Sequence, residues 1–122
     1  GATFDYTFDT STSAADPGTG KIRFNNADVT LASAMYIDAS NDAATNIQSF
    51  LNTIDDSTST IKGHFRISNR LDASDFALFT ISALTDNTGW FTVNCACAVN
   101  DNRDITSMPK NVNNLFILFL CQ

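Results

Sequence analysis

The apolar and polar residues of this chain alternate with a period of two through several short segments, a pattern typical of β-strands with one buried face. The first segment shows it most clearly, because Phe4, Tyr6 and Phe8 fall on one face and threonine and aspartate fall on the other. The segments that predict strands are residues 2–9, 21–25, 34–39, 61–68, 76–84, 90–99 and 115–121. Polar stretches rich in Gly, Asn, Asp and Ser separate them and predict turns and loops.

One segment shows the helical period instead. Its apolar residues follow the i, i+3, i+4, i+7 spacing of a buried helix stripe. They are Ile47, Phe50, Leu51 and Ile54. Thr45 and Gln48 have the spacing of a capping box, and Asp42 is an alternative N-cap. The sequence therefore predicts one short helix over residues 45–55, of about three turns at most.

Two of the predicted strands, residues 76–84 and 115–121, are apolar on both faces. Such a strand must lie inside a sheet that is covered on both sides, or against another subunit. We therefore expect these strands to supply a subunit interface. The expected interface residues are Phe76, Leu78, Phe79, Phe116 and Leu118.

The strand and turn pattern, with 43% hydrophobic and only 16% charged residues, favours an all-β protein with one short helix. The length suits one domain spanning residues 1–122.

Thirteen acidic residues against seven basic ones give a net charge of −6. This charge repels phosphate backbones and anionic lipids, so nucleic acid is not an expected partner. No apolar stretch approaches the ~20 residues of a membrane-spanning helix, so we expect no membrane insertion. The chain begins Gly-Ala without an initiator methionine, so we expect a processed chain or a piece of a longer protein.

The residues with reactive side chains do not form a recognisable catalytic pattern. His64 is the only histidine, and its position on the polar face of a predicted strand favours a surface role. Cys95 and Cys97 lie on the same face of one strand, which favours buried thiols in a reducing compartment over zinc ligation. Cys121 is expected to be a further apolar filler.

Several aspartates could be imagined as calcium ligands or as a carboxylate pair, but they lack the spacing of a calcium loop. They are Asp16, Asp42, Asp55 and Asp56, and turn and capping roles are favoured for them. There is also no G-x-S-x-G motif and no second histidine for a triad. We expect neither an enzyme nor a bound metal or cofactor. A hydrolase of host polysaccharide would need a carboxylate pair that the sequence alone does not place.

A ligand-binding surface is the alternative to a purely structural role. Trp90 follows the turn signal at residues 85–89 and, with Tyr36, could stack on a sugar. Packing in the core or at a subunit interface is the favoured role for this tryptophan. The polar segment 100–114, which contains Arg103, is long for a simple turn and is a candidate functional loop.

Parts of the chain resemble a β-rich module of tailed bacteriophages, found in tail-fibre and minor structural proteins and often after collagen-like repeats. The resemblance is carried by DPGTGKIRFNNA, MYIDAS, DDSTSTIKGHFRIS and DFALFTISALTDNTGWFTV. The segment NCAC and the apolar ending NNLFILFLCQ depart from the module.

The resemblance implies an antiparallel β-sandwich of the jelly-roll kind that forms homotrimers. It also implies a non-enzymatic structural role in a virion, in a fibre or a capsid decoration. It also implies contacts with other phage virion proteins. The alternative is a receptor- or carbohydrate-binding head domain that presents Trp90, Tyr36 and Arg103 to a host surface glycan.

Overall fold

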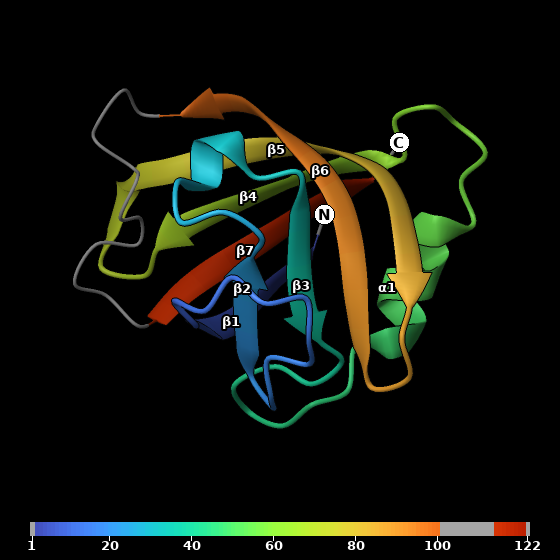
Figure 1. The fold of residues 1–122 in the computed structure, drawn as a ribbon, viewed down its shortest axis with the longest axis horizontal. Helices are drawn as coiled ribbons and strands as arrows, with labels where there is room; N and C mark the ends of the chain where they lie inside the picture. The colour runs from blue at the N-terminus through green and yellow to red at the C-terminus, as the bar shows by residue number, and fades with distance from the viewer. Residues whose placement is uncertain (1, 101–113, 122) are drawn as a thin grey trace.

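Seven strands form a closed barrel in the order β1-β2-β3-β6-β5-β4-β7 (Figure 1). The computed structural model describes residues 2–100 and 114–121 of the 122-residue chain. The strands are β1 (Ala2–Phe8), β2 (Lys21–Phe24), β3 (Ala34–Asp38), β4 (Gly63–Asn69), β5 (Asp72–Asp86), β6 (Trp90–Asn100) and β7 (Asn114–Cys121). A 3-10 turn, η1 (Val29–Leu31), and one α-helix, α1 (Gln48–Asp55), complete the described elements.

The all-β prediction with one short helix is confirmed, but the strands form one barrel where two packed sheets were expected. The closure depends on β1, which pairs antiparallel with β7 on one side and parallel with β2 on the other. The parallel contact is short and joins Thr7 to Lys21 and Phe8 to Ile22. Alternation along each strand does not distinguish a sandwich from a barrel, because both have one inner face.

A cluster of aromatic rings lies in the interior of the barrel among many aliphatic side chains. Phe65 and Phe79 stack with their centroids 4.8 Å apart and their planes within 9° of parallel. Phe24 lies 5.4 Å from Phe79, and Phe119 lies 6.2 Å from Phe65. All four side chains are buried. They come from β2, β4, β5 and β7, so one cluster ties together strands that are far apart in the sequence.

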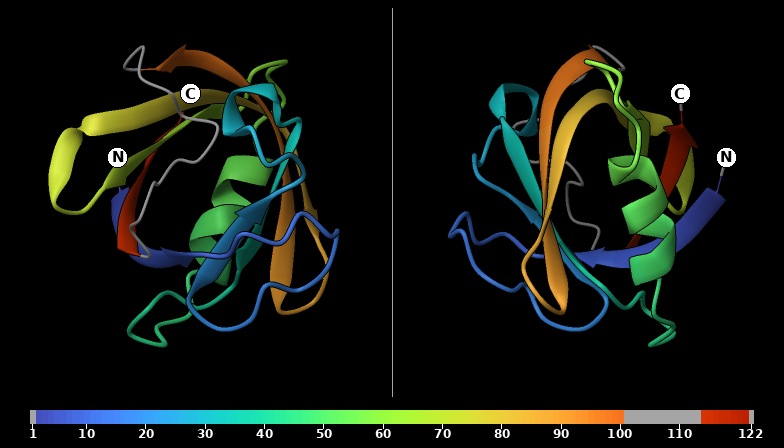
Figure 2. Two further views of the ribbon diagram at one scale, coloured as in Figure 1. Left: turned by 60° about the vertical axis from the view of Figure 1, so that its left-hand side comes forward. Right: turned by 90° about the vertical axis from the view of Figure 1, so that its right-hand side faces the viewer.

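Helix α1 packs against the barrel beside β5 (Figures 1 and 2). Leu51 and Ile54 belong to the buried core, as the helical spacing predicts. Phe50 is partly buried, and its ring lies 5.3 Å from that of Phe4 and 5.6 Å from that of Phe119. None of the helices in the described part of the chain is long and apolar enough to span a membrane.

The predicted helix caps are wrong. The N-cap position is Ile47, which makes no side-chain capping bond, and the Gln48 amide donates instead to the Asn46 side chain at 2.8 Å. Asp42 lies away from the helix start and accepts hydrogen bonds from Thr7 and Arg70. A cap is replaceable here because burial of the apolar stripe, rather than capping, is the main source of stability for a helix of this length.

Phe65→Ala should lower the free energy of unfolding by about 3–5 kcal/mol, because it removes a fully buried ring and leaves a cavity against Phe79. Urea denaturation followed by circular dichroism measures the change. Leu71→Ala is the matched control, since Leu71 is 89% exposed and its truncation should cost less than about 0.5 kcal/mol. A loss below about 1 kcal/mol for Phe65→Ala would contradict the assignment of this ring to the core.

Candidate functional site: the outer face of strands β5, β4 and β7

Strand β4 lies between β5 and β7, and the register of the two pairings brings outward-facing residues into rows across the three strands. One row joins Phe76, Ser68 and Phe116; the next joins Leu78, Arg66 and Leu118; the third joins Thr80, His64 and Leu120. We call this surface the β4 face. It carries apolar side chains from β5 and β7 on either side of a polar central strand.

The apolar side chains of the β4 face are only partly covered. Phe76, Leu78, Phe116 and Leu118 are half-buried, and Leu120 is 42% exposed. The residues between them on the same strands, including Ile67 and Ile117, are fully buried in the barrel. An outer sheet face with this many apolar side chains in adjacent rows is typical of an interaction surface.

Arg66 stands at the centre of the β4 face. Its guanidinium lies over the ring of Phe76, 4.6 Å from the centroid, and donates a hydrogen bond to the carbonyl oxygen of Ala73 at 2.7 Å. It forms no ion pair with any carboxylate in the described residues. The face therefore combines apolar area with a positive charge that no carboxylate of residues 2–100 or 114–121 pairs.

Arg70 borders the β4 face and connects it to a polar network. Its guanidinium lies 5.4 Å from the centroid of the Phe116 ring. It pairs with Asp42 at 3.1 Å and more loosely with Asp5 at 3.8 Å. Asp42 also accepts a hydrogen bond from the Thr7 hydroxyl at 2.9 Å. This network joins β1, the segment after β3 and the turn between β4 and β5.

Four of the five residues expected at a subunit interface lie together on the β4 face, namely Phe76, Leu78, Phe116 and Leu118. Phe79 does not, and this part of the expectation is corrected. It is fully buried inside the barrel, because it alternates with Leu78 along β5 and stacks on Phe65. Both faces of this strand are apolar in the sequence, so the pattern alone does not show which face the closed sheet encloses.

Arg66, Arg70 and Leu120 contribute to this surface or its border, but no pattern along a single strand identifies them. The signal that finds them is the pairing register, which places Arg66 opposite both Leu78 and Leu118. Register between strands that are distant in sequence is not visible in the alternation of any one strand.

Tyr36 and Trp90 do come together, as the ligand-surface alternative requires. Their rings meet edge to face, with centroids 6.0 Å apart and planes at 70°. Tyr36 is only 7% exposed, whereas Trp90 is half-buried. Trp90 therefore supplies the accessible ring of this pair and Tyr36 supports it. Arg103, the third residue of the predicted ligand surface, and most of the 100–114 segment lie outside the described residues.

The segment after β1 lies over part of the barrel near this aromatic pair. Arg23, which is opposite Tyr36 in the β2–β3 register, pairs with Asp9 at 2.7 Å and donates to the carbonyl oxygen of Ser13. Partial burial raises the pKa of Asp9, but the Ser11 amide and the Arg23 guanidinium outweigh it, so the pKa lies below its usual value. The contact between Asp9 and Arg23 is therefore charged at neutral pH.

The predicted turn roles of the aspartates are met in part. Asp16 accepts a hydrogen bond from the Gly18 amide, and Asp38 accepts one from the Ser40 amide. Burial raises the pKa of Asp38, the Ser40 amide opposes this, and a hydrogen bond with the Asp16 side chain raises it further. The Tyr6 hydroxyl donates to the main-chain oxygen of Asp38 at 2.8 Å. These contacts hold the segment before β2 against β3.

No group of three or more metal-binding side chains lies together in residues 2–100 and 114–121. His64 sits on the β4 face between Thr80 and Leu120, which agrees with its predicted surface position. Asp55 and Asp56 are exposed at the end of α1, and Asp55 lies 3.9 Å from Lys62.

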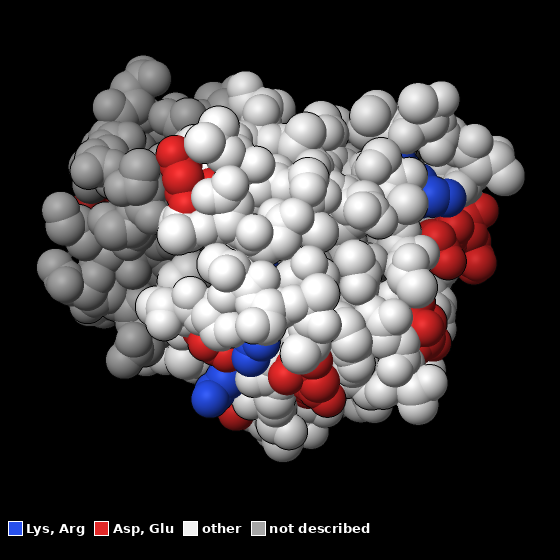
Figure 3. All heavy atoms as spheres, in the orientation of Figure 1, with Lys and Arg blue, Asp and Glu red and all other residues white. Residues whose placement is uncertain are grey.

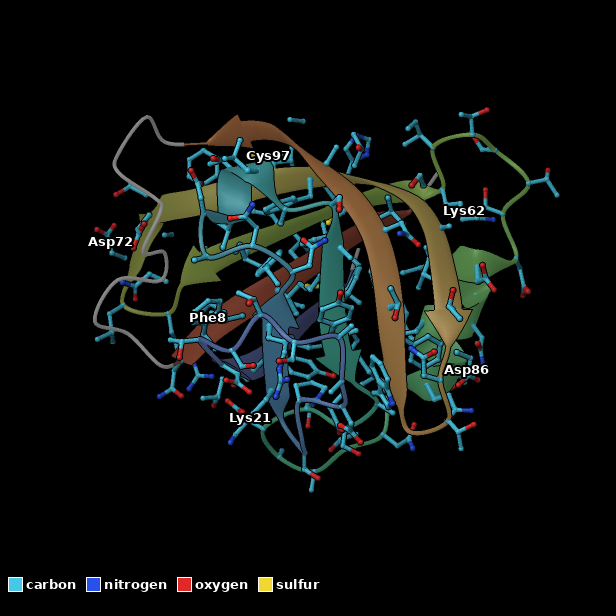
Figure 4. All side chains as sticks on the ribbon, viewed as in Figure 1. Phe8, Lys21, Lys62, Asp72, Asp86 and Cys97 are labelled. Carbon is cyan, nitrogen blue, oxygen red and sulfur yellow. The ribbon has the colours of Figure 1, made fainter. Side chains whose placement is uncertain are left out.

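Cys95 is a free, buried thiol, as predicted. Cys97 is half-buried against the core (Figure 4). Burial and, to a smaller extent, the neighbouring Cys97 raise the pKa of Cys95 to about 12. This thiol is therefore protonated and poorly nucleophilic at neutral pH. The side chain of Cys121 lies outside the described residues.

Comparisons with protein-family models, with curated proteins and with solved structures found no match to this chain. The resemblance to phage modules remains an expectation from the sequence.

Cys95 should react with iodoacetamide far more slowly in the folded protein than after unfolding, because its thiol is both buried and protonated. Peptide mapping by mass spectrometry after timed alkylation at pH 7.5 measures this for each cysteine. The unfolded chain in urea is the control. Labelling of Cys95 in the folded protein at the unfolded rate would show that the thiol is accessible and would contradict its position in the core.

Proposed function

We propose that this chain is a non-enzymatic structural domain of a bacteriophage virion, in a fibre or a capsid-decorating appendage, where it assembles as a homotrimer. The observation that carries the proposal is the β4 face, where apolar side chains lie half-buried on the outer side of the sheet. Such a face is stabilised when another protein surface removes it from water.

The rest of the described chain suits a structural role. The reactive side chains are dispersed or tied up in local contacts: Cys95 is buried and Asp9 is paired with Arg23. The barrel has an extensive aromatic core, which supports a rigid building block. The link to a virion rests on the resemblance of residues 16–27, 35–40, 55–68 and 75–93 to phage modules.

Purified protein at micromolar concentration should give three times the mass of one chain by light scattering. Phe116→Asp should weaken this association by at least about tenfold while leaving the barrel folded, because it places a charge on an apolar contact surface. Circular dichroism verifies the fold of the variant.

Leu71→Asp is the control for that experiment, since Leu71 is exposed at the turn between β4 and β5 and is not part of the rows of the β4 face. Phe79→Asp should behave differently and unfold the chain, because it buries a charge inside the barrel. A wild-type protein that stays monomeric over this concentration range would refute the trimer.

The second candidate is a receptor- or carbohydrate-binding head. The specific observation in its favour is the half-buried ring of Trp90, which is held edge-on to Tyr36. Asn87 lies in the adjoining turn and donates a hydrogen bond to the Thr92 hydroxyl at 2.9 Å. An aromatic ring beside amide and hydroxyl groups is a surface that suits a sugar.

If this candidate is right, Trp90→Ala should abolish binding on a glycan array or to host cells, and Trp90→Phe should retain part of it because a ring remains. Phe116→Asp serves as the control, since Phe116 lies on the β4 face and not beside Trp90. Binding that survives Trp90→Ala unchanged would remove this residue from any ligand site.

A further inference from the structure

The charge of the β4 face is opposite to that of the molecule as a whole. The chain carries a net charge of −6, yet Arg66 and His64 lie at the centre of this face. Arg70 at its border is paired with Asp42 and Asp5 and does not add to this positive charge. Arg66 is not neutralised by any carboxylate in the described residues. A partner surface that covers the apolar rows must therefore also accept a positive charge at their centre.

The position of Arg66 argues against a two-fold contact through this face. In a two-fold interface the same patch meets itself, so a face centred on Arg66 would bring two guanidinium groups together. Like charges enclosed by apolar side chains repel strongly. A heterologous contact avoids this, because the β4 face of one copy meets a different surface of the next copy. Heterologous contacts that close on themselves form rings, of which the trimer is one.

The described residues offer a complementary acidic surface elsewhere on the same chain. Asp55 and Asp56 are exposed at the C-terminal end of α1, and Asp86 is exposed at the end of β5. Helix α1 packs beside β5, and acidic atoms line this edge of the molecule in Figure 3. Figure 4 labels Asp86 and Lys62 on the same side. We call Asp55, Asp56 and Asp86 the acidic edge.

The acidic edge has little compensating charge. The ion pairs of the described residues include only one to this edge, a long contact of 3.9 Å between Lys62 and Asp55. Asp86 accepts a hydrogen bond from the Thr88 amide, which leaves its charge in place. One chain thus carries both an unpaired cation set in an apolar face and a group of weakly paired carboxylates on another edge.

We propose that copies of this chain associate head to tail, with the β4 face of one copy covering the acidic edge of the next and Arg66 pairing with its carboxylates. The inference rests on the proposed function, since it assigns the two surfaces of the proposed homotrimer. It commits to a second copy of this chain as the occupant of the β4 face. Apolar contact supplies the affinity, and the charges fix the orientation of the copies.

Charge reversal on each surface, separately and together, tests the assignment. Arg66→Glu should weaken association by about tenfold or more, and so should the combined variant Asp55→Lys, Asp56→Lys, Asp86→Lys. Equimolar mixing of the two variants should restore hetero-association, because the face of each variant then meets an edge of opposite charge on the other. Placing all four changes in one chain should restore the homotrimer, because every contact is then matched with its signs exchanged. Sedimentation equilibrium at low ionic strength measures each species.

Lys21→Glu is the matched control, because it reverses an exposed cation on β2, outside both surfaces, and should leave association unchanged. Circular dichroism and thermal melting check that Arg66→Glu folds, since this arginine also contacts Phe76 and Ala73. Leu118→Asp gives a second variant of the β4 face that leaves Arg66 in place.

The outcomes separate this inference from the proposed function. A trimer that persists in Arg66→Glu and in Leu118→Asp overturns the head-to-tail contact but leaves the trimer standing. Dissociation by Arg66→Glu without recovery in the four-change chain overturns the acidic edge as its partner. A wild-type dimer overturns the closed head-to-tail trimer. A wild-type monomer at all concentrations overturns the proposed homotrimer itself.

Discussion

Closure of the seven-stranded sheet is the constraint on which the rest of this structure depends, because it decides which side of every strand is enclosed. The enclosed space is filled by aliphatic side chains and a cluster of phenylalanine rings, in which Phe65 and Phe79 stack with their centroids 4.8 Å apart. Successive side chains of a strand point to opposite faces of the sheet. Apolar residues that alternate with the core residues therefore lie on the outside of the barrel. The core and the β4 face are therefore two consequences of one geometry.

The β4 face gives this outward apolar area a chemical character. Phe76 and Phe116 flank Ser68, and Arg66 lies one row away between two leucines. The Arg66 guanidinium lies over the Phe76 ring, so its positive charge is held within the apolar area. Arg70 lies near the Phe116 ring at the border, where Asp42 and Asp5 pair with it. A face of this kind favours a partner that is apolar and acidic, and the chain's own acidic edge meets the second requirement.

Much of the secondary structure was predictable, because strands such as β1 and the apolar stripe of α1 have unambiguous periods. The closed barrel was not predictable, because the short parallel pairing of β1 with β2 does not change the apolar and polar pattern of either strand. The candidate site was predictable in part. The excess of apolar residues located the face, but only register separated Phe79 from its neighbour Leu78 and placed Arg66 at the centre.

The central claim is that the β4 face becomes buried when copies of this chain meet. Hydroxyl-radical footprinting of the wild-type protein across its association range measures this directly at individual side chains. Phe76 and Phe116 should lose reactivity as concentration rises, whereas Leu31, which is 69% exposed on η1 and belongs to neither the β4 face nor the acidic edge, should not change. If the mass rises to that of a trimer while Phe76 and Phe116 stay as reactive as in the monomer, the contact lies elsewhere and the account is wrong.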